Sequence, residues 1–531
     1  AFAGYNSLIC MAQALGELAS QERIEILVIT NQAFDVIGSE ALNPSVSATL
    51  GPCKVVPLEY PNISCRAIDL FLAPGDLPAI GSISTDLINE VRSGSSDSMV
   101  AYRNGIRWVA RIEPLLTDSE PPAKLDVRPD GTYLLTGGMG EIEFEIARWL
   151  RGLGAAKLVV VGLRESDDAI LTRYDSAIVD DAPPPVQRRL QELTQLGLEI
   201  FADTHDISNY DTMKAVLESA RARFGSINGV IHSAFATGGG MIQLKTTESS
   251  AKVFAPKVTG TQVIEELLSN NPLDFVVLFS TTLSLTGVFG QVDYCAANAY
   301  LDAFAAQLRA RHGVNAVAID WDVISWERWQ ELAMEASPEL QSQIREVRER
   351  YGVTPPEAVR CIEAALALNY PQLIISTRDF LKVAGTRTKV EDSEAIAQIA
   401  AALRSPIGHI RPDLPSAYIA PTGETEEAIA AVWRDLFGIE GIGANDDFFN
   451  LGGNSLVAIQ AISRLRSEFD VDLPMSALFE HPTISSLARV ISRQRSEDGD
   501  TVDMEALLAE IESLTPDQVR AALAKEQTGD H

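Results

Sequence analysis

A lysine, a tyrosine and an asparagine near the middle of the chain can together transfer a proton. Tyr294 and Asn298 are four residues apart in the segment YCAAN, so a helix would place both on one face. Reducing a ketone requires a proton donor at the carbonyl oxygen while a hydride reaches the carbon. A tyrosine becomes a usable donor when a nearby ammonium lowers the pKa of its phenol. Lys257 can supply that ammonium or extend a proton relay through Asn298, and the hydroxyl of Ser280 or Thr281 can hold the substrate oxygen.

Each of these residues also has a more ordinary role. A tyrosine on a helix is usually half-buried for packing, and a lysine is usually solvated. Only their occurrence together, behind a segment that reads strand–glycine loop–helix, favours catalysis over packing.

The glycine loop lies between a predicted strand, Thr132–Thr136, and a predicted helix. Backbone N–H groups at such a helix N-terminus can bind a diphosphate, because no Cβ atom stands in the way. The full dinucleotide pattern has a further glycine at position 143, where this chain has Glu143, and Glu141 adds a second carboxylate. A plain strand–turn–helix segment without nucleotide therefore stays open as an alternative. The loop residues are Gly137, Gly138, Met139 and Gly140.

Two polar residues at the ends of the following strands favour a nicotinamide cofactor. Arg164 follows the second predicted strand, where a guanidinium can bind a ribose 2′-phosphate, and this favours NADPH over NADH. Glu165, beside it, weakens that preference. Asp203 ends the next predicted strand and is placed to accept a hydrogen bond from adenine.

A serine near the C-terminal end can carry a covalently attached group. Ser455 follows a Gly-Gly turn in DDFFNLGGNSL and begins a predicted helix. A serine that anchors a phosphorylated arm must be exposed at a helix N-terminus, where the helix dipole tolerates phosphate. The alternative is that Ser455 only caps its helix, which is a common role for serine.

Composition excludes several classes of protein. The 531 residues include 43 basic and 73 acidic ones, so the formal net charge is −30. Such a chain repels phosphate backbones and anionic membranes, and we expect neither nucleic acid nor a membrane as a partner. Five unpaired cysteines indicate a reduced, cytoplasmic protein, and six scattered histidines give no support for a metal site. The chain opens without an initiator Met or a signal-peptide pattern, so we expect it to be a piece of something longer.

Alternating apolar runs and helical spacings predict a doubly wound parallel sheet in the middle of the chain. Before it, residues 5–114 also have an α/β pattern, with strands expected at 24–30, 53–58 and 67–72 and a hairpin at Asn104-Gly105. No glycine loop follows the first of these strands, so we expect a scaffold there. The expected strands of the central sheet are Thr132–Thr136, Lys157–Val161, Leu198–Ala202, Gly229–His232, Phe275–Phe279 and Asn315–Asp320.

The central motifs resemble the ketoreductase domain of modular type I polyketide synthases, a relative of the short-chain dehydrogenases/reductases. The resembling segments are TYLLTGGMG, GVIHSA, FAPKVTGT, FVVLFSTT and GQVDYCAANAYLDAFA. The resemblance implies that Lys257, Tyr294 and Asn298 are catalytic and that Thr281 takes the role of the family's serine, with Ser280 as the substitute. The segments VITNQAFDV and GPCKVVPLEYPN resemble the family's catalytically silent structural subdomain. Both halves are thus expected to be Rossmann-like.

The C-terminal motifs resemble acyl or peptidyl carrier domains, which are four-helix folds. The segments are DDFFNLGGNSL, LVAIQAISRLRSEF and LFEHPTISSLA. The resemblance implies 4′-phosphopantetheine on Ser455, attached by a phosphopantetheinyl transferase, with neighbouring polyketide synthase domains or modules as partners. Asn454, where many polyketide carriers have Asp, favours carriers of mixed polyketide–peptide assembly lines.

These observations predict five segments along the chain. They are a structural subdomain (1–125), a catalytic subdomain (126–385), a linker (386–422), a carrier domain (423–495) and a helical tail that could dock a partner (496–531).

Three functions stay open. The leading one is NADPH-dependent reduction of a carrier-bound β-ketoacyl thioester to a β-hydroxyacyl thioester. In the second, Glu141 and Glu143 keep NADPH out and leave a redox-inactive scaffold or an epimerase. In the third, only the carrier works and the α/β body docks partners. The configuration of the hydroxyl cannot be read, because Thr237-Gly238-Gly239 replaces Leu-Asp-Asp and Thr286 replaces the tryptophan of the two stereochemical classes.

Overall fold

The computed structural model divides into two compact units, Ala1–Glu391 and Asp392–His531, each with its own hydrophobic core. Arg164, the tail 496–531 and most of the linker lie outside the described residues, and Ser455 is described only through its backbone. The described residues are 2–17, 22–38, 40–60, 62–72, 80–95, 97–115, 127–162, 184–236, 238–326, 338–382, 409–410, 418–437, 439–448, 450–451, 455–469, 471, 473 and 477–494.

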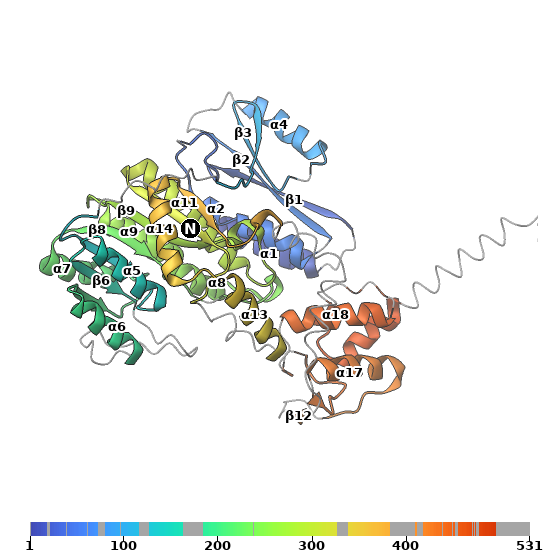
Figure 1. Ribbon diagram of the computed structural model, residues 1–531. Coiled ribbons are helices and arrows are strands. Elements are labelled where there is room, and N and C mark those ends of the chain that lie inside the picture. The colour runs from blue at the N-terminus through green and yellow to red at the C-terminus, as the bar shows by residue number, and fades with distance from the viewer. Residues whose placement is uncertain are drawn as a thin grey trace, which may run out of the picture. The chain divides into compact units, whose positions relative to one another are not determined.

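A seven-stranded sheet forms the centre of the first unit, with the order β11-β10-β9-β8-β5-β6-β7 and every neighbouring pair parallel (Figure 1). This confirms the predicted doubly wound α/β fold. The strand order reverses between β5 and β8, so the connections after these two strands run in opposite directions. Doubly wound sheets bind their ligands at this point, next to the carboxyl ends of the strands. The strands are β5 (Thr132–Thr136), β6 (Lys157–Val161), β7 (Glu199–Asp203), β8 (Ile227–His232), β9 (Phe275–Thr281), β10 (Asn315–Trp321) and β11 (Gln372–Ile375).

Helices cover both faces of this sheet. Strands β5, β6 and β9 are almost entirely buried and rich in Val, Ile and Leu, as expected of a parallel sheet that packs on both sides. Alternate residues of β5 enter different cores: Leu134 packs with one set of helices, whereas Tyr133 and Leu135 pack with the other. The first set includes α7 (Tyr210–Phe224), α8 (Thr247–Phe254), α9 (Gly260–Leu268) and α11 (Val292–His312), and the second includes α5 (Glu141–Gly152), α6 (Pro184–Gln195) and α14 (Pro355–Leu368).

Shorter elements and one further helix complete the region around this sheet. These elements are the 3-10 turn η3 (Ile242–Leu244), the π-helical turn η4 (Ala255–Thr259), α10 (Leu283–Thr286) and α13 (Pro338–Tyr351).

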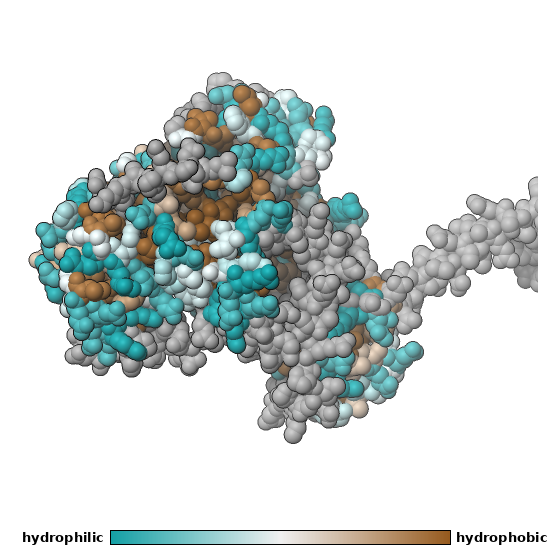
Figure 2. All heavy atoms as spheres, viewed as in Figure 1, coloured by the Kyte–Doolittle hydropathy of each residue, from teal (hydrophilic) through white to brown (hydrophobic). Residues whose placement is uncertain are grey.

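Hydrophilic side chains cover the visible face over α6, and apolar side chains gather nearer the middle of the first unit (Figure 2).

A four-stranded sheet precedes this region in the chain. Its order is β1-β2-β3-β4, with the first three strands parallel and the last two forming an antiparallel hairpin. The hairpin turns at Asn104 and Gly105, which both have positive φ, as a two-residue type I′ turn requires. The elements are α1 (Ala3–Glu17), β1 (Ile24–Asn31), α2 (Pro44–Ser47), α3 (Leu50–Glu59), β2 (Ile63–Leu70), α4 (Ile80–Arg92), β3 (Met99–Arg103) and β4 (Ile106–Val109).

The expectation of a strand at 53–58 is wrong, because these residues belong to helix α3. Val55 and Val56 are fully buried in the core that α11 also enters. Gly51 of α3 lies so close to α11 that a Cβ atom there would be 2.6 Å from the backbone nitrogen of Ala296. The small alanines of α11 permit this close approach, and the packing between the helices overrides the strand preference of the two valines.

The second unit is a small helical bundle in its described part. Trp433, Phe448 and Leu465 are fully buried in its core. Its elements are the strands β12 (His409–Ile410) and β13 (Ile439–Glu440), which pair with each other, and α17 (Gly423–Phe437), α18 (Ser455–Phe469), α19 (Ala477–Glu480) and a helix at 484–494.

Candidate functional site

The structure brings Lys257 and Tyr294 together next to β9. The Lys257 Nζ lies 5.8 Å from the centre of the Tyr294 ring and donates a hydrogen bond of 2.8 Å to the carbonyl oxygen of Phe279. Lys257 lies in the π-helical turn η4, a rare geometry that often occurs at functional sites. Both side chains are buried, with 3% and 8% of their surface exposed. The structure thus brings the Lys257 amine near the Tyr294 ring, and the roles of the two residues in proton transfer stay predictions.

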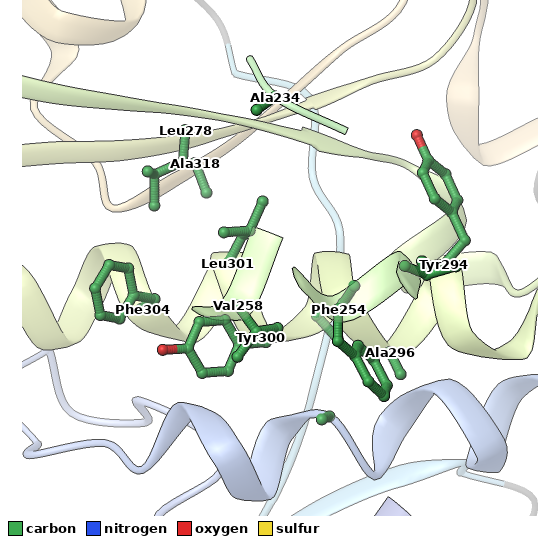
Figure 3. Packing of buried hydrophobic residues seen from close by; sticks show 14 of the residues in the cluster. Ala234, Phe254, Val258, Leu278, Tyr294, Ala296, Tyr300, Leu301, Phe304 and Ala318 are labelled. Atoms are coloured by element: carbon green, nitrogen blue, oxygen red, sulfur yellow. The ribbon is translucent and has the colours of Figure 1, made fainter. Parts of the chain in front are cut away.

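Helix α11 positions Tyr294 on the side of the sheet. In Figure 3 the ring rises from the helix toward the strands, whereas Ala296 faces the opposite side. Asp293 in the first turn, Arg309 in the last turn and Gly313 in the left-handed conformation after it stabilise this helix at its ends.

Asn298 lies one turn after Tyr294 and contacts both the helix and the strand. Its Nδ2 donates to the carbonyl oxygen of Tyr294 at 2.8 Å, and its backbone oxygen accepts a 3.4 Å hydrogen bond from Ser280 Oγ. Its Oδ1 is buried and accepts no hydrogen bond among the described residues. A buried acceptor of this kind needs a donor such as a water molecule or a bound ligand, which suits a link in a proton relay.

Ser280 and Thr281 stand at the end of β9 in different surroundings. Ser280 faces α11, where the buried carboxyls of Asp302 and Asp320 also contact its hydroxyl. The Thr281 hydroxyl donates to the carbonyl oxygen of Trp321 at 3.3 Å and accepts from the backbone of Leu283 at 3.4 Å. The choice between the two hydroxyls stays a prediction.

The structure contains a buried ion pair next to Tyr294 that the sequence analysis does not predict. The Lys245 Nζ lies 2.5 Å from Asp293 Oδ2 and donates to the carbonyl oxygen of Gly239 at 2.6 Å. Asp293 Oδ1 accepts from the backbone nitrogen of Tyr294 at 2.9 Å. The ion pair therefore ties the segment after β8 to the start of the tyrosine helix. Asp293 directly before Tyr294 was the only sequence signal of this arrangement.

Glu59, at the end of α3, makes hydrogen bonds to the same region. Its Oε2 accepts from the backbone nitrogen of Ile242 at 2.6 Å, and its Oε1 accepts from that of Gly290 at 3.0 Å. Burial raises the pKa of Glu59 to about 7, although both hydrogen bonds oppose the rise. One carboxyl at the end of α3 thus binds backbone groups of two segments, one before α8 and one before α11.

The glycine loop has the backbone geometry that a close phosphate requires. Gly137 and Gly138 have φ values of +115° and +106°, which favour glycine. A Cβ at Gly137 would lie 2.5 Å from the hydroxyl of Ser233. Arg189 donates to the carbonyl oxygen of Met139 at 2.9 Å and so supports the loop from α6. In these respects the loop fits a dinucleotide.

Glu143 departs from this fit, because its side chain turns back onto the loop. It is 6% exposed, and its Oε1 lies 2.7 Å from the hydroxyl oxygen of Ser233. Its Oε2 lies over Gly140, where a Cβ would come within 2.6 Å of it. Burial raises the pKa of Glu143 above its usual range, since the charged form loses its solvation. Glu141, in contrast, is exposed.

The remaining predicted cofactor residue with a described side chain is Asp203. One oxygen of its carboxylate, Oδ1, accepts from the backbone nitrogen of His205 at 2.8 Å and contacts the ring Nδ1 at 2.7 Å. The adenine contact expected of Asp203 stays a prediction. In the part of the chain that the structure describes, no group of three or more His, Cys, Asp or Glu side chains is arranged to hold a metal ion. No described helix has the length and apolar character needed to cross a membrane.

Ser455 is the first residue of α18, a helix of 15 residues. The backbone N–H groups of a first turn attract an anion, so this position is compatible with a phosphodiester on the serine. The core beneath α18 includes Ala458, Ile462 and Leu465, which lie on one face of the helix.

Comparison with known proteins matches both parts of the chain. Residues 131–326 match the KR domain family, and residues 427–491 match the family described as phosphopantetheine attachment site. A phenolphthiocerol/phthiocerol polyketide synthase protein of Mycobacterium tuberculosis is 26% identical over 511 residues, which cover 91% of this chain and 24% of that protein. The pikromycin polyketide synthase component PikAIII of Streptomyces venezuelae is 27% identical over 474 residues, covering 84% and 28%.

Among solved structures, the first ketoreductase of the tylosin polyketide synthase has a TM-score of 0.57 and 24% identity over 72% of this chain and 76% of that one. The chain thus contains a region of the KR domain family with a ketoreductase fold, followed by a region of the phosphopantetheine attachment site family. Over most of its length the chain is similar to polyketide synthases, and it spans about a quarter of the length of the curated relatives named above.

Proposed function

We propose that this chain reduces a β-ketoacyl thioester to a β-hydroxyacyl thioester while the substrate is tethered to Ser455. The observation that carries the proposal is the buried Lys257 ammonium 5.8 Å from the centre of the Tyr294 ring. NADPH, when bound, supplies the hydride. The residues of this chain that would hold it are Gly137, Gly138, Met139, Gly140, Arg164 and Asp203.

In the proposed reaction, Tyr294 gives its phenolic proton to the oxygen of the substrate ketone as that oxygen gains negative charge. Lys257 stabilises the phenolate that remains, because opposite charges in a buried site interact strongly. Asn298 connects this pair to a proton source through its buried Oδ1. The hydroxyl of Thr281, or that of Ser280, orients the substrate oxygen.

The carrier domain supplies the substrate in this proposal. A phosphopantetheinyl transferase attaches 4′-phosphopantetheine to Ser455, and neighbouring polyketide synthase domains load the acyl group. Tethering gives the ketone a high effective concentration at the reductase. The proposal uses the five segments expected from the sequence, with limits at residues 125, 385, 422 and 495. The linker between the catalytic subdomain and the carrier domain lets the carrier deliver the tethered substrate.

The test follows the absorbance of NADPH in the presence of the full chain and a β-ketoacyl-pantetheine thioester. Tyr294→Phe should abolish the consumption of NADPH. Tyr300→Phe is the matched control, because it removes a hydroxyl from the same helix, where the ring stacks on Phe304 in the core. Activity that survives Tyr294→Phe contradicts the proposal. Intact-protein mass after treatment with the transferase and coenzyme A should show the added arm, and Ser455→Ala should prevent it.

The position of Glu143 favours a second candidate, a non-reducing domain. If its carboxyl keeps the dinucleotide out, Tyr294 serves only proton exchange at the substrate, as in an epimerase, or the α/β body acts as a scaffold. Titration of NADPH by fluorescence separates the two candidates, since tight binding to the unmodified chain would eliminate the second.

A further inference from the structure

We propose that Glu143 occupies, from within the chain, the place that a diphosphate would take at the N-terminus of α5, and that this occupancy weakens dinucleotide binding. The proposal rests on the proposed function, because it concerns the cofactor of that site. It assigns to one side chain the control of nucleotide affinity.

The first step is the position of Glu143 in its helix. Gly140 is the N-cap of α5, and Glu143 is the third residue after it. A glutamate at this position can fold back onto the N-cap and satisfy its backbone N–H, as in one half of a capping box. A Cβ atom on Gly140 would lie 2.6 Å from Glu143 Oε2, so the side chain does fold back over the N-cap. The helix end that would offer its N–H groups to an anion is therefore covered by a carboxyl of the chain itself.

The second step is the hydrogen bonding of Ser233. Its single hydroxyl hydrogen faces two acceptors, the carbonyl oxygen of Thr136 at 2.6 Å and Glu143 Oε1 at 2.7 Å. Both contacts are satisfied when Ser233 donates to Thr136 and a protonated Glu143 donates to Ser233. Burial raises the pKa of Glu143 and so favours the protonated state, whereas the hydrogen bonds from Ser233 and from the backbone of Glu143 and Gly140, and the charge of Arg189, oppose it. The buried Glu143 side chain is thus held over the loop by its hydrogen bond with Ser233.

The third step is the consequence for a nucleotide. Two phosphates can approach Gly140 only after the Glu143 side chain has left its pocket and lost its bond to Ser233. Occupancy of space, rather than repulsion of charge, is then the main obstacle. Glu141 is exposed, so solvent screens its charge, and it should matter little.

The variants are chosen to separate the effect of the volume of the Glu143 side chain from the effect of its charge. NADPH fluorescence is titrated on the full chain and on Glu143→Gly, Glu143→Ala and Glu143→Gln, with Glu141→Gln as the matched surface control. We expect Glu143→Gly and Glu143→Ala to bind at least tenfold tighter. Glu143→Gln should bind within about twofold of the unmodified chain, because the amide fills the same space, and so should Glu141→Gln. Glu143→Ala keeps a good helix former at this position, and thermal melting confirms that each variant is folded.

Two results would overturn the inference: unchanged affinity in both small variants, or a gain in Glu143→Gln equal to that in Glu143→Gly, which would indicate charge repulsion. The outcome is separable from that of the proposed function. An unmodified chain that binds as tightly as Glu143→Gly refutes the inference and leaves reduction intact. A chain that gains binding with Glu143→Gly, yet reduces no substrate in any form, upholds the inference and refutes reduction.

Discussion

The Lys257 ammonium is fixed on two sides, by the carbonyl oxygen of Phe279 and by the ring of Tyr294. The first contact comes from β9 and the second from α11, so the lysine connects the sheet to the helix that carries the phenol. Its position depends on the packing of both elements, and a change in either should alter the reaction.

Removing the ammonium should slow reduction far more than it disturbs folding. Lys257→Met keeps an apolar chain of similar length in the buried site, and we expect kcat to fall by about 10²–10⁴-fold, the range for a lost proton-transfer group. Lys252→Met, an exposed change in the preceding helix α8, is the control and should retain full activity. The measurement is steady-state reduction of the pantetheine thioester. A loss in Lys257→Met of less than tenfold would argue against the assigned role.

The titration of Glu59 should make stability depend on pH. Because the pKa in the folded chain is about 7, against about 4.5 unfolded, the contribution is fully present below pH 4.5 and is lost as the pH rises through 7. The loss amounts to about 3 kcal/mol at most. Melting temperatures between pH 5 and 8 should therefore fall more steeply for the unmodified chain than for Glu59→Gln. Parallel curves would show that Glu59 does not titrate in this window.

Breaking the buried ion pair should be costly, and removing both charges should be less so. Lys245→Met leaves the Asp293 carboxylate buried without its ammonium, a change that costs about 3–5 kcal/mol. Adding Asp293→Asn removes that stranded charge and should recover part of the loss. Urea denaturation of the two single variants and the double variant gives the coupling energy. Losses that simply add would mean that the two charges do not interact.

The close contact between α3 and α11 should make Gly51 intolerant of a side chain. Gly51→Ala places a methyl group within 2.6 Å of Ala296, and we expect a loss of about 1–3 kcal/mol. Gly152→Ala is the matched control, because nothing lies within 4 Å of its Cβ position, and it should be neutral or stabilise by up to about 1 kcal/mol. Urea denaturation compares the two. Equal stabilities would show that the helices separate without cost.

Much of the fold could be predicted from the sequence, because the parallel strands are continuous apolar runs between helical segments. The expected runs at Thr132–Thr136 and Lys157–Val161 coincide with β5 and β6. The seventh strand, β11, has only four residues, too few to show a pattern. The prediction of a strand at 53–58 was wrong because the two valines of this run favour a strand. Packing against α11, more than 200 residues later in the chain, stabilises a helix there instead.

The catalytic residues were predictable as types and spacings, and their assigned roles stay predictions. The contacts of Glu59 and Lys245 could not be predicted, since each acts on backbone groups that only the folded chain brings near. Glu143 stood out as a departure from the glycine pattern, which suggested repulsion. Its burial against Ser233 instead indicates that the side chain occupies space at the loop, and a sequence does not reveal such burial.

The shared core of α1, α3 and α11 limits how this part of the chain can be engineered. Tyr5 and Val55 pack in the same cluster as Tyr300, and these residues come from both sides of the proposed limit at residue 125. A chimaera joined at that limit would remove the apolar residues of α1 and α3 that pack against α11. The exposed apolar surface of α11 would then favour aggregation. Exchange of reductases between assembly lines should therefore move both sheets as one block.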